Sequence, residues 1–216
     1  MMALIETLSS GFPLLVLGGM AVNFKIACIA LLAGLALGLL LAYARVYSTV
    51  AGYAAMPLIG LMRAAPTFVV MFFLLNAIPR DATLFGAPFA LSGVMIVALS
   101  LVPYAAAYIA DSGIEGLRQW RKGSRLGALL FLPNVTRAFF ILVMSSSAGA
   151  AIGVTEGITV ILRQAERLPL LGDRLALFAM GIVLFGIPLQ AGLALVRLIQ
   201  RRLSEKMTHE AAASSA

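Results

Sequence analysis

A cluster of basic side chains interrupts the apolar second half of the chain. It contains Trp120 and five cations: Arg118, Arg121, Lys122, Arg125 and Arg137. Guanidinium and ammonium groups beside apolar stretches bind anions, either lipid headgroups or acidic residues of a partner protein. The sequence has no Gly-rich loop ending in Gly-Lys-Ser/Thr, the motif that cradles nucleotide phosphates. The cluster therefore predicts a binding segment and not a site of ATP hydrolysis.

Polar residues within or beside the apolar stretches form a second set of candidates. Arg63 and Pro66 lie at one such point, and the triplet Ser145, Ser146 and Ser147 at another. Arg63 is a candidate for meeting a substrate carboxylate, or for anchoring a loop at the headgroups. The serines are candidates for lining a substrate pathway, or for packing helices by bonding to their own backbone.

Two acidic residues lie one helical turn apart before the basic cluster. They are Asp111 and Glu115. At this spacing both carboxylates lie on one face of a helix. We expect them to pair with Arg118 or Arg45 and so to hold the loop.

The composition is that of an integral membrane protein. The 216 residues are 62% hydrophobic and 12% charged, and the mean hydropathy is +1.02. The apolar runs suit helices, not the alternating segments of a barrel. The single Cys (Cys28) and single His (His209) provide no disulfide and no metal cluster. The net charge of +7 lies beside apolar spans, a pattern that argues against nucleic acid as partner.

Five membrane-spanning helices are predicted. They cover about residues 14–44, 56–78, 89–110, 138–155 and 175–196, and residues 201–216 are expected to form a disordered cytoplasmic tail. Gly34 and Gly38 form a small-xxx-small pair that favours close helix packing. Because Lys and Arg concentrate in the central loop and the tail, we place these inside the cell, with the N-terminus outside.

Four short blocks occur in a fixed order along residues 18–168. They are residues 62–67 (Met-Arg-Ala-Ala-Pro-Thr), residues 105–111, the loop at 119–133 with Gly127, Leu132 and Pro133, and residues 152–156 (Ile-Gly-Val-Thr-Glu). In this order they resemble the membrane subunits of bacterial ABC importers, specifically the polar amino acid permease family (histidine, glutamine, arginine and opine type). In that family the first block reads Phe-Arg-Gly-Thr-Pro, and the third carries a Glu-Ala-Ala signature.

The resemblance implies a fold, a mechanism and partners. The fold would be that of a type I ABC importer in the bacterial inner membrane. Two permease subunits, identical or homologous, would form the pathway for amino acids or similar small polar solutes. The loop at 111–137 would dock on a cytoplasmic ATPase, which would hold the ATP, and a periplasmic solute-binding protein would deliver the substrate. This chain itself would bind no cofactor and would not be an enzyme.

The sequence departs from the family pattern at two places. Arg121, Lys122 and Gly123 stand where the Glu-Ala-Ala triplet is expected, and the following gap to Leu132 is shorter than usual. Met144 stands where the fourth helix usually carries a Lys. Two alternatives therefore remain: a secondary transporter, and a degenerate, non-transporting paralogue or scaffold with a modified coupling loop.

Overall fold

The computed structural model describes residues 11–78, 83–84, 87–88, 91–124 and 131–213. The helices in chain order are α2 (Phe12–Tyr47), α3 (Thr49–Ala64), α4 (Thr67–Ala77), α5 (Gly93–Arg121), α7 (Phe131–Ser145), the 3-10 helix η1 (Ser146–Ile152), α8 (Gly157–Glu166) and α9 (Leu171–Ala213). Two short strands, β1 (Thr83–Leu84) and β2 (Ala87–Pro88), pair antiparallel.

The described helices confirm the predicted class of all-helical membrane protein. Four stretches are long and apolar enough to cross a bilayer: α2, α5, α7 with η1, and the Leu171–Leu198 part of α9. The bent pair α3–α4 makes a fifth if it is taken as one span. The predicted number of about five spans agrees with this result.

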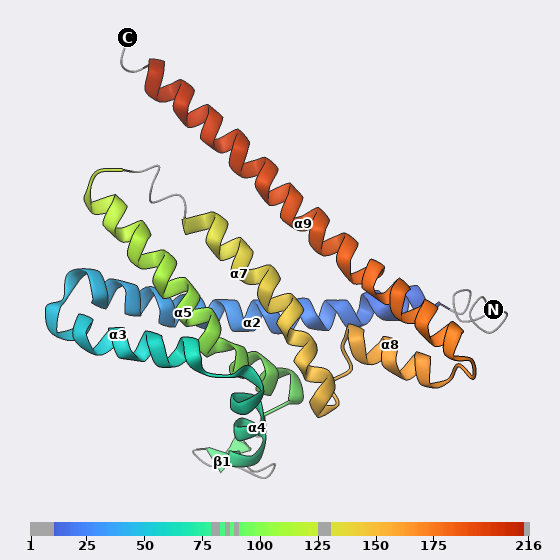
Figure 1. The fold of residues 1–216 in the computed structure, drawn as a ribbon. Coiled ribbons are helices and arrows are strands. Elements are labelled where there is room, and N and C mark those ends of the chain that lie inside the picture. Colours follow the sequence, from blue (N-terminus) through green and yellow to red (C-terminus); the bar gives the residue numbers. More distant parts are fainter. Residues whose placement is uncertain (1–10, 79–82, 85–86, 89–90, 125–130, 214–216) are drawn as a thin grey trace.

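Helix α2 contacts α3, α5, α7 and α8, whereas α4 packs on α5 and α9 packs on α7 and α8 (Figure 1). Its closest approach to α5 lies at Gly34 and Gly38. A Cβ at Gly34 would lie 2.5 Å from the Ala105 side chain, and one at Gly38 would lie 2.6 Å from the Ala106 carbonyl oxygen. The predicted close packing at this glycine pair is therefore confirmed, because no larger side chain fits between the two backbones.

The predicted span at 56–78 is not one continuous helix. It is divided between α3 and α4, whose axes differ by 92°. The break lies at Ala65 and Pro66, both extended with ψ of 114° and 123°. Proline has no backbone N–H and disfavours a helical conformation of the residue before it. Pro66, treated above as a pathway candidate, therefore determines where the helix breaks.

The second half of the bundle is divided more finely than predicted. The span at 138–155 consists of α7, which begins earlier, and η1, which ends at Gly153 with φ of 80°. Helix α8 follows within the mixed-charge segment. Helix α9 extends to Ala213, well past the predicted end at 196, and so includes most of the tail predicted as disordered. That tail contains four Ala, two Arg and two Glu, residue types that favour helix.

Three close contacts pack α9 against α7 and α8. A Cβ at Gly181 would lie 2.6 Å from the Ile161 side chain of α8, and one at Gly192 would lie 2.4 Å from the Phe140 ring of α7. Between them, the Phe185 ring covers Gly157 at the start of α8. Beyond these contacts α9 runs away from the other helices toward the C-terminus (Figure 1).

Candidate functional site

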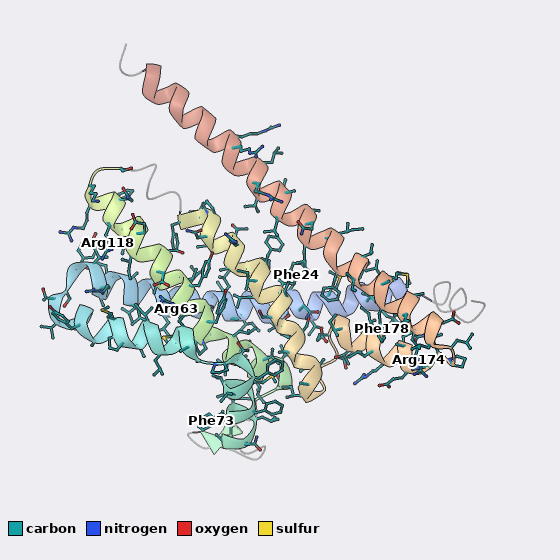
Figure 2. The ribbon with its side chains drawn as sticks, in the orientation of Figure 1. Phe24, Arg63, Phe73, Arg118, Arg174 and Phe178 are labelled. Carbon is teal, nitrogen blue, oxygen red and sulfur yellow. The ribbon has the colours of Figure 1, made fainter. Side chains whose placement is uncertain are left out.

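The basic cluster begins on the last turns of α5. Arg118, Trp120 and Lys122 are exposed there, and Trp120 presents 60% of its surface to solvent. Gly123, with φ of 80°, ends the helix in a left-handed conformation, and the Ser124 N–H donates to the Gln119 carbonyl oxygen at 3.0 Å. This is a common way to satisfy the last carbonyls of a helix. Figure 2 shows Arg118 at this end of α5.

The remaining predicted loop residues are divided by the gap in the described chain. Arg125 and Gly127 lie outside the described residues. Leu132 and Pro133 form the first turn of α7, where Leu132 is exposed. The structure thus describes both ends of the predicted coupling loop.

Arg121, at the position where the family has Glu, contacts α2. Its Nη1 donates to the Val46 carbonyl oxygen at 3.1 Å, and its guanidinium lies 5.5 Å from the centroid of the Tyr47 ring. A cation at the C-terminal end of a helix is favourable because the last carbonyls there have no helical partner. Arg121 therefore ties the end of α5 to the end of α2.

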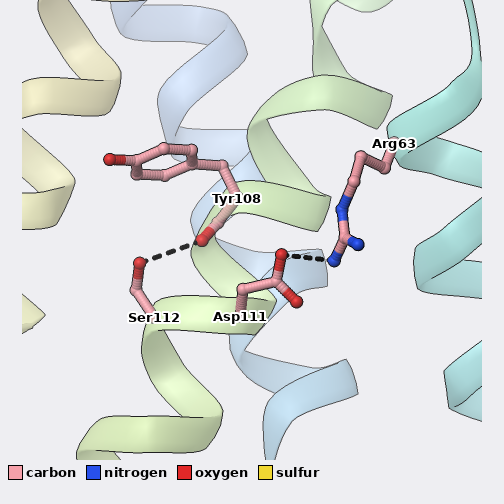
Figure 3. Close-up of polar contacts among 4 residues, drawn as sticks. All are labelled: Arg63, Tyr108, Asp111 and Ser112. Carbon is pink, nitrogen blue, oxygen red and sulfur yellow. Dashed lines mark hydrogen bonds and ion pairs between the residues drawn. The ribbon is translucent and has the colours of Figure 1, made fainter.

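Arg63 also has a partner within the chain. It forms an ion pair with Asp111, which joins the last turn of α3 to α5 (Figure 3). The expectation that Asp111 pairs with Arg118 or Arg45 was wrong, since α3 runs back along α5 and places Arg63 beside that carboxylate. The next residue of α5, Ser112, donates from its hydroxyl to the Tyr108 carbonyl oxygen at 3.0 Å (Figure 3).

Glu156 is fully buried and accepts four hydrogen bonds. Oε1 accepts from the Thr159 N–H at 2.8 Å and the Thr159 hydroxyl at 2.9 Å. Oε2 accepts from the Ile158 N–H at 2.9 Å and from Asn23 Nδ2 at 3.0 Å. The carboxylate is thus the N-cap of α8 and bonds to α2 at the same time.

Asn23 completes this buried network across three elements. Its Nδ2 also donates to the Ser146 hydroxyl at 2.8 Å, and its Oδ1 accepts from the Gly157 N–H at 3.1 Å. The Ser146 hydroxyl in turn donates to the Val143 carbonyl oxygen at 2.7 Å. Every polar atom of the network has a partner, so its members hold α2, η1 and α8 together and leave no free group for a solute.

The serine triplet is divided by this network. Ser146 is buried within it, whereas Ser145 and Ser147 are half-buried. Sequence reasoning missed Asn23 and Glu156, because all strong charges were placed at span ends. One signal was present: an Asn within an apolar span and a Glu just before a new helix both need partners when buried.

Among solved structures, the chain is similar to that described as "Crystal structure of an amino acid ABC transporter with histidines". The TM-score is 0.66, the sequence identity is 18%, and the match covers 87% of this chain and 94% of that chain. Neither protein-family models nor curated proteins match the sequence. At this identity the likeness shows the fold.

The fold and the described spans define an all-helical membrane protein with an ABC-transporter-like architecture.

Proposed function

We propose that the chain is a permease subunit of an ATP-driven importer for amino acids or similar small polar solutes. It forms the pathway with a second permease subunit in a bacterial inner membrane, and a separate cytoplasmic ATPase docks on the loop at 111–137. A solute-binding protein delivers the substrate. The observation that carries the proposal is the likeness in fold, over 87% of the chain, to an amino acid ABC transporter.

The residue types at the two exposed ends of the loop suit a contact with another protein. Arg118, Trp120 and Lys122 present two cations and an aromatic surface at one exposed end, and Leu132 adds an apolar surface at the other. Interfaces between proteins are enriched in Trp and Arg. An acidic groove on an ATPase is the complementary partner.

The alternative of a secondary transporter receives less support from the same residues. Such a transporter needs an ionisable group that changes its partners during transport. Glu156 is the most deeply buried acidic residue of the described chain, but its two oxygens already accept four hydrogen bonds. These hydrogen bonds indicate a structural role for Glu156 and not a group that changes its partners.

The alternative of a degenerate paralogue has one specific observation in its favour. Arg121 stands at the expected Glu position and bonds to Val46 and Tyr47 of the same chain. A subunit with that contact retains its fold without the family's coupling residue. Partner binding and transport therefore have to be measured separately.

The deciding experiment is affinity purification of the tagged chain from native membranes, with mass spectrometry of its partners, followed by reconstitution of the purified assembly. Recovery of an ATPase and a second permease, with solute uptake that requires ATP, supports the importer. Uptake driven by an ion gradient without ATP supports the secondary transporter. Partner recovery without uptake supports the degenerate paralogue.

A further inference from the structure

A cleft of about 540 Å³ lies between α7 and α9. Two cations line it, Arg137 from α7 and Arg197 from α9, together with the amide side chain of Asn134. The rest of its wall is apolar and includes Ile141, Met144 and Val196. None of the described residues that line the cleft is acidic, so it combines positive charge with an apolar surface.

The two guanidinium groups have no acidic partner among the residues that the structure describes. Each is exposed. Two like charges facing one cleft repel each other unless an anion lies between them. A phosphate group suits this position because each guanidinium can donate two parallel hydrogen bonds to its oxygens.

The position of the cleft along the spans identifies the kind of anion. Arg197 is the first charged residue after the uncharged apolar run at 175–196 of α9. Arg137 lies six residues after the start of α7 at Phe131, about 9 Å along the helix. Cations at the end of an apolar span lie at the level of the lipid headgroups.

The apolar wall runs from this level toward the hydrocarbon. The cleft extends along α7 from Pro133 to Met144, a distance of about 16 Å. Only 17% of an 18-residue apolar stretch of α9 is buried within the chain, so most of this helix is available to lipid. Gly192 keeps α9 close to Phe140 beside the cleft. A phospholipid matches both parts of the cleft, because its phosphate would lie at the cationic end and an acyl chain would lie along the apolar wall.

We propose that the α7–α9 cleft is a binding site for an anionic phospholipid, with its phosphate on Arg137 and Arg197 and one acyl chain along Ile141, Met144 and Val196. Basic pockets between membrane helices are known to favour such headgroups. The site does not depend on the proposed transport function, because it requires only that the helices span a bilayer.

The test is native mass spectrometry of the full chain, delipidated in detergent and titrated with dioleoyl phosphatidylglycerol or dioleoyl phosphatidylcholine. We expect the anionic lipid to bind at least about tenfold more tightly, the scale of one or more charge-assisted hydrogen bonds. The variant Arg137→Gln/Arg197→Gln should reduce this preference to that of the neutral lipid. The matched control Arg201→Gln/Arg202→Gln removes two charges from the same helix outside the cleft and should keep the preference.

One further variant and one competitor complete the test. The variant Arg137→Lys/Arg197→Lys keeps the charge but loses the bidentate geometry, and we expect an intermediate preference from a chain that should fold normally. Lipid-free glycerophosphoglycerol should not displace the lipid, since it cannot use the apolar wall. The proposal would be overturned if the two lipids bound equally well, or if the cleft and control variants lost the same preference for the anionic lipid. Full displacement by the lipid-free headgroup would also overturn it and would indicate a solute anion instead.

Discussion

The guanidinium of Arg63 and the carboxylate of Asp111 join the end of α3 to α5 directly before the chain bends at Pro66 (Figure 3). The pair is partly exposed, with 60% and 48% of the two side chains accessible. It is therefore placed to hold α3 in position without being buried.

The first prediction concerns the strength of that pair. Arg63→Ala and Asp111→Ala should each lower stability, and the double variant should lose less than the sum, with a coupling free energy of about 0.5–1 kcal/mol because solvent screens the charges. Unfolding of the four proteins in detergent measures this difference. The charge swap Arg63→Asp/Asp111→Arg should recover part of it. Strictly additive losses would show that the pair contributes nothing.

The second prediction concerns the buried network around Glu156. Glu156→Ala removes the acceptor of the Ile158 and Thr159 N–H groups and of one Nδ2–H of Asn23, and it should cost about 3 kcal/mol. Ser146→Ala removes one acceptor from Asn23 and should cost about 1 kcal/mol. Thermal unfolding of the variants in detergent measures whether Glu156→Ala lowers stability more than Ser146→Ala.

A neighbouring serine provides the control for the network. Ser147→Ala changes a half-buried residue outside the network and should alter stability by no more than about 0.5 kcal/mol. If Ser146→Ala and Ser147→Ala behaved alike, the network would not be the reason for the stability of this region.

The third prediction concerns the space beside Gly157. A Cβ there would lie 2.4 Å from the Phe185 ring and 3.3 Å from Asn23 Oδ1. Gly157→Ala should therefore lower stability by about 1–3 kcal/mol, and adding Phe185→Leu should restore part of the loss. Gly186→Ala is the matched control, because nothing lies within 4 Å of the new methyl group. A neutral Gly157→Ala would show that α9 moves without cost.

The fourth prediction separates two roles within the basic cluster. Arg118→Glu/Lys122→Glu should reduce recovery of the proposed ATPase while the melting temperature of the chain falls by less than in Arg121→Glu, since both residues are exposed and lose only the favourable interaction with the helix end. Arg121→Glu should lower the melting temperature as well, because it places a carboxylate next to the Val46 carbonyl oxygen. Pull-down and thermal unfolding of the same preparations measure both effects. Full recovery of the ATPase with Arg118→Glu/Lys122→Glu would count against docking on this surface.

Local sequence features predicted part of this fold correctly. The apolar runs within α2, α5 and α9 have span length, and Gly34 and Gly38 marked a close packing site, because hydropathy and small residues act locally. The change of chain direction at Pro66 was not predicted, because apolar residues on both sides of the proline resemble one continuous span. The helical tail of α9 was missed because polar composition was given more weight than helix propensity.

The polar interior could not be predicted from local features. Asn23 and Glu156 are separated by 133 positions in the sequence, and no local pattern shows that they meet. Arg63 and Asp111 were both noted as candidates, but only the packing of α3 against α5 shows that they pair with each other. Such partners follow from the path of the chain and not from the residue types alone.

The bend at Pro66 also has a consequence for how the chain enters the membrane during synthesis. Helix α3 has 16 residues and α4 has 11, whereas a segment that inserts by itself needs about 20 apolar residues. Helix α4 packs against α5, which the ribosome makes later. We therefore expect the bent pair to reach its final position only after α5 has emerged, so that the three helices of this region insert together.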